Sequence, residues 1–288
     1  MSFGASTTAE EVTEGLDLSG TTWLVTGVNS GLGYETARVL ALRGGRIVGL
    51  SRTKEKADNA LSELGIEGVG VACELSDLTS VRAAVETVKG LGPLDGIIAN
   101  AGIMALPANQ QIHGVERQLF TNHVGHFVLV TGILGQLTDA GRVVILSSGA
   151  HRMAERGIEL DNIDGTTDYH PWRLYGRSKL ANILFARKLA AGFAGTNKTA
   201  NAVHPGVIRT NLARHIENPE PMFASLKPVL KSVGAGAATQ VMVATHPSLA
   251  ETSGEYFADC AVAEVLNAQD GDEDALWAWT EELVASIA

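Results

Sequence analysis

Short apolar runs alternate with longer amphipathic segments along most of the chain. The short runs are rich in Val, Ile and Leu and are bounded by Gly, Asn, Ser or Asp. They predict strands at 22–27, 46–50, 69–72, 94–99, 142–147 and 199–203. The segments between them predict helices at 32–43, 54–64, 78–89, 120–137 and 172–191. Strands separated by helices favour an α/β fold, a doubly wound parallel sheet with helices on both faces.

The sequence predicts one domain over 1–288, because it contains no internal repeat, low-complexity tract or Pro/Ser-rich linker. Residues 1–18 form an N-terminal extension to it. Two longer connections, 149–171 and 211–231, follow the ends of predicted strands. Open α/β sheets bind ligands at the carboxyl ends of their strands, so we expect both connections to contribute to a substrate site. The alternative is that they are surface insertions without a role.

Charge and composition narrow the classes of function. With 22 basic and 32 acidic residues the net charge is −10, which disfavours binding to nucleic acid or to an anionic membrane surface. Residues 118–137 carry no charge and are long enough to span a bilayer, but they contain two His, two Gln and one Asn. We therefore expect a buried helix of a soluble, cytoplasmic protein. The chain starts without the features of a signal peptide, and its two distant cysteines predict neither a disulfide framework nor a metal site.

A glycine-rich turn joins the first predicted strand to the first helix. In Thr26-Gly-Val-Asn-Ser-Gly-Leu-Gly33, Gly27 allows a tight turn, Gly31 allows close approach of a phosphate, and Gly33 allows the helix to pack on the sheet. The free N–H groups and the helix dipole would then bind a pyrophosphate. Glycines can serve turns alone, but the strand–turn–helix context favours a dinucleotide and hence a Rossmann fold.

The end of the second predicted strand indicates which dinucleotide the chain binds. Proteins that bind NAD place an Asp or Glu there for the ribose 2′-OH, whereas this chain has Gly49-Leu-Ser-Arg-Thr53. Arg52 can pair with a 2′-phosphate, so we expect NADP rather than NAD. The alternative is a solvated arginine.

Several polar residues point to acid–base chemistry beside that cofactor. Tyr175 and Lys179 are four residues apart on one predicted helix face, and a nearby ammonium can lower the pKa of a phenol by about 1–3 units. Ser147 and Ser148 end the fifth strand, where a hydroxyl can bind a reacting oxygen. Asn122 lies in the uncharged helix, where an amide needs partners. None of these features is specific alone.

Together with Asn100-Ala101-Gly102 and Pro205-Gly206, these motifs resemble the short-chain dehydrogenase/reductase family from about residue 21 to 257. Asn122-His-Val-Gly-His-Phe127 and the long gap before Tyr175 look closest to its retinol-dehydrogenase-like branch. The resemblance implies a general acid–base at Tyr175, a Lys179 that lowers its pKa and holds the nicotinamide ribose, a substrate-orienting Ser148, and an Asn122 that holds a relay water. It also implies pairing into a homodimer or homotetramer through the helices that carry Asn122 and Tyr175. The implied cofactor-binding set is Gly27, Asn29, Ser30, Gly31, Leu32, Gly33, Arg52, Glu74, Leu75, Asn100, Ala101, Gly102, Tyr175, Lys179, Pro205, Gly206, Ile208 and Thr210.

The expected reaction interconverts a hydrophobic alcohol, aromatic or alicyclic, and its ketone or aldehyde. Apolar residues in the loops could line the substrate pocket: Met104, Leu106, Met153, Trp172, Met222 and Phe223. Glu74 departs from the family, which usually has an Asp touching adenine. A non-catalytic sensor of NADP(H) remains an alternative, as does reduction of a conjugated double bond as in protochlorophyllide oxidoreductase.

Two other patterns suggest different chemistry. His123-x-x-His126 could be half of a metal site but lacks a third ligand at suitable spacing, so a packing role is favoured and no metal is expected. Ser148, His151 and Asp161 could suggest a hydrolase, but the sequence has no Gly-x-Ser-x-Gly turn.

Overall fold

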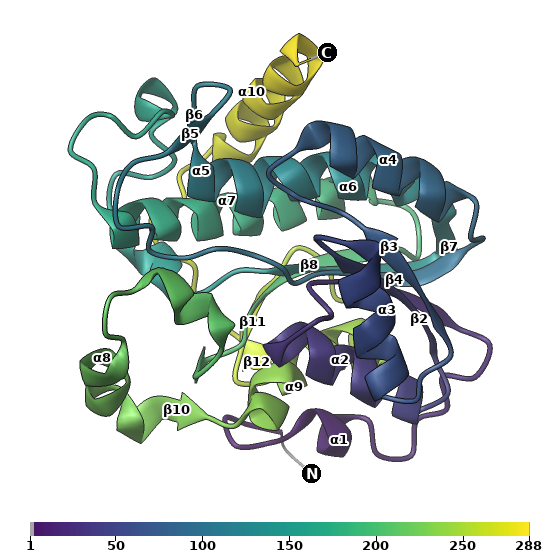
Figure 1. Ribbon diagram of the computed structural model, residues 1–288. Coiled ribbons are helices and arrows are strands. Elements are labelled where there is room, and N and C mark those ends of the chain that lie inside the picture. Colours follow the sequence, from purple (N-terminus) through teal and green to yellow (C-terminus); the bar gives the residue numbers. More distant parts are fainter. Residues whose placement is uncertain (1–2, 288) are drawn as a thin grey trace.

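A mostly parallel sheet with helices on both faces dominates the computed structural model, which describes residues 3–287 (Figure 1). Within these residues the sheet has eight strands in the order β12-β11-β8-β7-β4-β1-β2-β3, of which β12 alone is antiparallel to its neighbour. The strands are β1 (Thr22–Thr26), β2 (Arg46–Ser51), β3 (Gly68–Ala72), β4 (Leu94–Ala99), β7 (Leu137–Leu146), β8 (Thr199–His204), β11 (Tyr256–Ala258) and β12 (Ala261–Val262). The predicted fold class, a doubly wound α/β sheet, is confirmed.

Helices cover the sheet because their apolar stripes and the continuously apolar strands bury one another. One face carries α2 (Gly31–Leu42), α3 (Lys54–Glu63) and α9 (Val233–Thr245), with the short α1 (Ala9–Val12) against α2 and α9. The other face carries α4 (Leu78–Lys89), α6 (Gly125–Ile133) and α7 (Pro171–Gly192). The core therefore has two parts, one on each side of the sheet.

All six predicted strands are present, but the helix predicted at 120–137 is not one regular α-helix. It consists of α5 (Arg117–Leu119), a π-helical stretch (Phe120–Val124), α6 and a short 3-10 turn (Leu134–Gln136). The chain is already extended at Leu137, five residues before the predicted start of β7. Leu137 pairs with Leu94, and regular pairing resumes at Gly96 and Arg142 after an irregularity. Residues 118–130 are buried, as predicted from the lack of charge, whereas Gly135 near the end of the stretch is exposed.

The helix α10 (Asp272–Ser286) packs on the outside of α7 and of the π-helical stretch (Figure 1). The ring of Trp277 lies 4.8 Å from that of Phe127 and 6.0 Å from that of Phe185, measured between centroids. His123 Nε2 is 3.0 Å from the Thr280 hydroxyl. Neither this helix nor α9 was predicted from the sequence pattern. No helix among the described residues combines the length and the apolar character needed to cross a membrane.

Both long connections contain short elements at the carboxyl ends of β7 and β8. The first holds two 3-10 turns, at Gly149–Met153 and Leu160–Asn162. The second, residues 211–231, is called the flap below; it holds a 3-10 helix (Asn211–His215), α8 (Glu220–Ser225), a further 3-10 turn (Lys227–Val229) and β10 (Leu230–Lys231). β10 pairs with β9 (Val207–Ile208), and a hairpin of β5 (Gln111–Ile112) and β6 (Val115–Glu116) lies before α5.

Candidate active site

A cavity of about 730 Å³ lies where the carboxyl ends of β1, β2, β4, β7 and β8 meet. Successive strands are added in opposite directions from the boundary between β1 and β4, which is the point where sheets of this kind bind ligands. Two predicted site residues, Gly33 and Asn122, do not line the cavity. The predicted residues that line it are Gly27, Asn29, Ser30, Gly31, Leu32, Arg52, Glu74, Leu75, Asn100, Ala101, Gly102, Ser148, Tyr175, Lys179, Pro205, Gly206, Ile208 and Thr210.

The glycine-rich turn has the backbone that a phosphate site requires. Gly27 and Gly31 have φ of +76° and +58°, a region that favours glycine. Ser30 caps α2 without a side-chain hydrogen bond, which leaves the first N–H groups of this helix available to an anion from the cavity. These residues therefore fit the pyrophosphate of a dinucleotide. Gly33 serves packing instead, since a Cβ there would lie 2.3 Å from the Gly27 carbonyl oxygen.

Arg52 and Glu74 line the cavity, and they differ in exposure and in hydrogen bonding. Arg52 is exposed just after β2. Glu74 Oε1 accepts hydrogen bonds from the Ser76 N–H (3.0 Å) and the Ser76 hydroxyl (2.7 Å). The Glu74 carboxylate is therefore held by its own turn.

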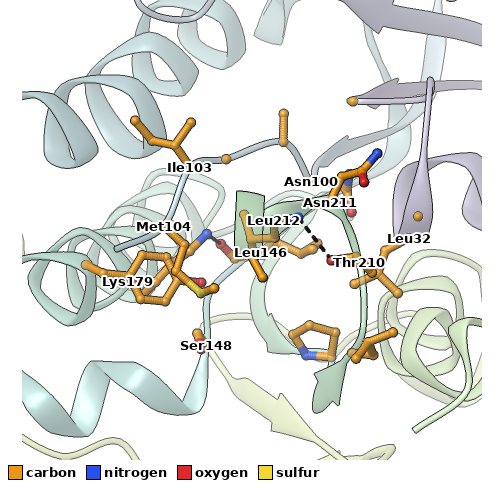
Figure 2. A pocket seen from close by; sticks show the side chains of 18 of the residues that line it. Leu32, Asn100, Ile103, Met104, Leu146, Ser148, Lys179, Thr210, Asn211 and Leu212 are labelled. Carbon is orange, nitrogen blue, oxygen red and sulfur yellow. Dashed lines mark hydrogen bonds between the residues drawn. The ribbon is translucent and has the colours of Figure 1, made fainter. Parts of the chain in front are cut away.

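Tyr175 and Lys179 are both buried on α7 beside the cavity (Figure 2 shows Lys179 with Met104 and Ser148). Lys179 Nζ lies 5.7 Å from the centre of the Tyr175 ring and donates to the Leu146 carbonyl at 3.0 Å. Burial raises the pKa of Tyr175 to about 12, against a smaller effect of the Ser148 side chain, and burial lowers the pKa of Lys179 to about 8. Loss of hydration disfavours both charged forms, and Lys179 is not among the groups that shift the pKa of Tyr175 in this structure; its effect on Tyr175 stays a prediction.

The two serines that end β7 have different environments. The Ser147 hydroxyl is buried and donates to the Lys179 carbonyl at 2.7 Å, so it ties β7 to α7. The Ser148 hydroxyl accepts the Ala150 N–H at 3.1 Å and interacts with the side chain of Tyr175. Ser148 is therefore the serine placed to share a ligand oxygen with Tyr175.

Asn122 acts behind the cavity wall. Its Oδ1 accepts the Ile103 N–H at 2.8 Å, and its Nδ2 donates to the Ile103 carbonyl and to the Ser178 hydroxyl, each at 2.9 Å. These bonds hold the segment that follows Asn100-Ala101-Gly102 and fully satisfy the amide. In this structure the Asn122 side chain positions the wall and does not face the cavity.

Thr26 and His126 play a part in the site that the sequence pattern did not indicate. The Thr26 hydroxyl oxygen accepts the N–H groups of Asn100 and Ala101, both at 2.9 Å, and so has its proton to give to His126 Nε2 at 3.0 Å. His126 Nδ1 then donates to the Asn122 carbonyl at 2.9 Å. This chain of bonds joins β1, β4 and the π-helical stretch behind the cavity.

His204 was also missed, although it directly precedes Pro205-Gly206. Its Nδ1 accepts the Gly149 N–H at 3.0 Å and the Gly206 N–H at 3.4 Å. Burial lowers the pKa of His204 to about 4, which keeps the ring neutral and able to accept. His204 therefore connects the loop after Ser148 to the loop that carries Ile208 and Thr210.

The end of the cavity nearest Tyr175 is mostly apolar. Met104, Met153, Trp172, Met222 and Phe223 line the cavity, as the sequence analysis predicted. The exception is Leu106, which is buried in the core and does not line the cavity; its carbonyl accepts the Tyr169 hydroxyl at 2.7 Å.

His123 and His126 have packing partners. Both are fully buried, and burial lowers the pKa of His123 to about 3 and that of His126 to about 4. Each ring is hydrogen-bonded to protein groups. Across residues 3–287, no group of three or more His, Cys, Asp or Glu is arranged to hold a metal ion.

Comparison with known proteins assigns the family. The sequence pattern of the short chain dehydrogenase family matches residues 21–221. The chain is 38% identical to short-chain dehydrogenase TIC 32 A, chloroplastic, of Brassica napus, over 99% of this chain and 95% of that protein. It is 36% identical to human retinol dehydrogenase 14, over 94% of this chain and 88% of that protein. Among solved structures it resembles a blue fluorescent protein from a metagenomic library in complex with NADPH, with a TM-score of 0.67 and 28% identity over 84% of this chain and 97% of that one. The chain belongs to the short-chain dehydrogenase family, with retinol dehydrogenases among its relatives.

Proposed function

We propose that the chain is an NADP-dependent oxidoreductase that interconverts a hydrophobic alcohol and its ketone or aldehyde. The observation that carries this proposal is the convergence of a dinucleotide turn with Tyr175, Lys179 and Ser148 in one cavity. Arg52, which stands where an NAD-binding protein has a carboxylate, and the NADPH held by the similar metagenomic protein support NADP.

In the proposed mechanism, side chains of the protein transfer the proton of the reaction. A bound nicotinamide ring supplies or accepts the hydride. Tyr175 passes the proton to or from the substrate oxygen, and Ser148 donates a hydrogen bond to the same oxygen. Protonated Lys179 favours the phenolate and binds the nicotinamide ribose. Because Tyr175 and Lys179 are both buried, the attraction between the Lys179 ammonium and the Tyr175 phenolate is only weakly screened by water.

The apolar end of the cavity supports a substrate with an aromatic or alicyclic body. Met153, Trp172, Met222 and Phe223 offer contact surface and few polar partners, so small polar alcohols gain little there. Steady turnover of small polar alcohols alone would contradict this part of the proposal.

The first test is a paired titration of the purified protein with NADPH and NADH. A charge-assisted contact to the 2′-phosphate predicts tighter binding of NADPH by about 10–150-fold. Tighter binding of NADH would make Arg52 a surface residue, and absence of binding by either would remove the catalytic proposal.

The second test separates catalysis from NADP sensing. Tyr175→Phe should lower turnover of an alicyclic or aromatic ketone by about 100-fold or more, because the proton donor is lost, while NADPH affinity stays unchanged. Tyr169→Phe is the matched control, since the Tyr169 hydroxyl only donates to the Leu106 carbonyl. Equal rates in the two variants would remove Tyr175 from the mechanism, and NADPH binding by the unaltered protein without any turnover would support a binding protein.

We also propose self-association into a dimer or tetramer. The helices expected to pair are α5–α6 and α7, and α10 covers the part of them that carries His123, Phe127 and Phe185. Pairing through these helices must therefore use the surface that α10 leaves free. A monomer in sedimentation would contradict the proposal.

A further inference from the structure

Two arginines from distant parts of the chain lie at the same end of the cavity. Arg52 follows β2, and Arg214 belongs to the 3-10 helix Asn211–His215 of the flap; both line the cavity. Burial and, next in size, the positive charge of Arg52 lower the pKa of Arg214, while Glu74 acts in the opposite direction. The two guanidinium groups are therefore near neighbours, and their charges repel.

Within the part of the chain that the structure describes, neither arginine forms an ion pair. The hydrogen bond of Arg214 goes to the Asn211 carbonyl, at 3.1 Å. Glu74, the neighbouring acid, is hydrogen-bonded to Ser76. Arg209 in the preceding loop differs, because it binds both carboxylate oxygens of Glu220, at 2.7 and 2.9 Å, and lies over the Phe223 ring. Among the described residues, two like charges thus line the cavity, and the neighbouring Glu74 forms an ion pair with neither.

We propose that Arg214 joins Arg52 in binding the 2′-phosphate of NADP, so that the adenosine end of the cofactor is held partly by the flap. This inference rests on the proposed function. A phosphate dianion accepts hydrogen bonds from two guanidinium forks and removes their mutual repulsion. NADH offers no anion at this point and leaves the repulsion as it is in the free protein, so only NADPH gains affinity from the pair.

The same segment connects this end of the cavity to the substrate end. The flap begins against the glycine-rich turn, because a Cβ at Gly31 would lie 3.3 Å from Thr210 Cγ2. Arg214 follows Thr210 by four residues, and Met222, Phe223 and Leu226 of the flap line the apolar part of the cavity. Holding Arg214 on the phosphate therefore orders the segment that forms one wall of the substrate site. NADPH should prepare this wall, and NADH should not.

The experiment compares four ligands and four variants by calorimetric or fluorescence titration, without any turnover. The ligands are NADPH, NADH, 2′-phospho-ADP-ribose and ADP-ribose, so that the phosphate is tested with and without nicotinamide. The variants are Arg214→Gln, Arg52→Gln, their double variant, and Arg187→Gln as the control, whose charge is already paired with Glu273 and which does not line the cavity. We expect Arg214→Gln to weaken NADPH and 2′-phospho-ADP-ribose by about 10-fold or more and to leave NADH and ADP-ribose unchanged. Arg187→Gln should change none of them.

A second readout follows the flap itself. Hydrogen exchange is measured separately on the protein saturated with NADPH and on the protein saturated with NADH. NADPH should protect the backbone amides of 211–215 more than NADH does, and Arg214→Gln should remove the difference.

Three results would overturn the inference. If Arg52→Gln removes the preference for NADPH and Arg214→Gln keeps it, Arg214 has no part and the proposed function stands. If Arg214→Gln weakens all four ligands equally, Arg214 binds the shared pyrophosphate. If the unaltered protein binds NADH better than NADPH, the proposed cofactor is wrong and the inference falls with it.

Discussion

Gly33 shows how a residue outside the cavity can determine its shape. Its φ is not in the left-handed region, so the backbone itself would accept another residue. The restriction is contact, since a Cβ would lie 2.3 Å from the Gly27 carbonyl oxygen and 2.7 Å from Asn100 Nδ2. Both neighbours belong to the cavity wall and neither can move away without displacing the turn.

Gly33→Ala should therefore weaken NADPH binding by about 10-fold or more and lower the free energy of unfolding by about 1–3 kcal/mol. Gly135→Ala is the control, because a Cβ at Gly135 meets no atom within 4 Å. Titration with NADPH and urea unfolding of both variants measure the two effects. An alanine at 33 that binds NADPH normally would show that the turn is free to shift.

At this scale the sequence predicts residues required by the backbone better than residues brought together by the fold. The glycine-rich turn, Ser148, Tyr175 and Lys179 were found because their spacing is local. The hydrogen bonds of Thr26 and His126 join positions 100 residues apart, which no local pattern encodes. Arg214 was missed for the same reason, since its significance depends on its distance from Arg52. That burial raises the pKa of Tyr175 was not predicted, because the extent of its burial is a property of the fold.

Among the elements, α10 contributes to the core although it lies outside the two helical layers. Trp277 contacts the rings of Phe127 and Phe185, and Thr280 is hydrogen-bonded to His123. Arg82 of α4 donates to the carbonyls of Val284 and Ile287 at 3.2 and 2.6 Å. The helix thus connects α4, the π-helical stretch and α7.

Trp277→Ala should lower the free energy of unfolding by about 2–4 kcal/mol, because it removes a large ring from contact with two buried phenylalanines. Glu282→Ala on the exposed side of α10 should have little effect. Urea unfolding followed by circular dichroism measures both. Equal stability of the two variants would mean that α10 is only loosely attached.

Long elements with strong periodicity were predicted well, and short or uniformly apolar ones were not. β1, β2, β3, β4, β7 and β8 were found from their β-branched runs. β11 has three residues and β12 has two, so neither presents a pattern. α9 is buried almost throughout, and a helix that is apolar on all sides shows no 3.6-residue period. The early start of β7 depends on the pairing of Leu137 with Leu94, which no pattern local to either residue specifies.

For the whole molecule, buried neutral histidines make the free energy of unfolding depend on pH in the acid range. Burial lowers the pKa of His123 to about 3 and the pKa values of His126 and His204 to about 4, below the unfolded value of 6.5. Their contribution to stability is complete above pH 6.5 and is lost as pH falls toward 4. For His126 or His204 it amounts to about 3 kcal/mol at most. Burial raises the pKa of Glu116, so this carboxyl acts in the opposite direction.

We therefore expect the free energy of unfolding to fall by several kcal/mol between pH 6.5 and 4.5, with a slope of about 1.4 kcal/mol per pH unit for each histidine that remains neutral. Urea unfolding at a series of pH values measures the slope. His123→Asn should have a flatter profile than the unaltered protein. Parallel profiles would show that His123 does not control acid stability.

The position of α10 also has a consequence for how the protein is made. The partners of Trp277 lie at 127 and 185, so the ribosome completes them long before it reaches the helix that covers them. Until residue 286 has emerged, the aromatic face of α6 and α7 is open to chaperones and to other nascent chains. A product interrupted before residue 272 would keep that face exposed permanently and become a substrate for protein quality control. Burial of this aromatic face thus depends on a helix that is synthesised well after the two phenylalanines that it covers.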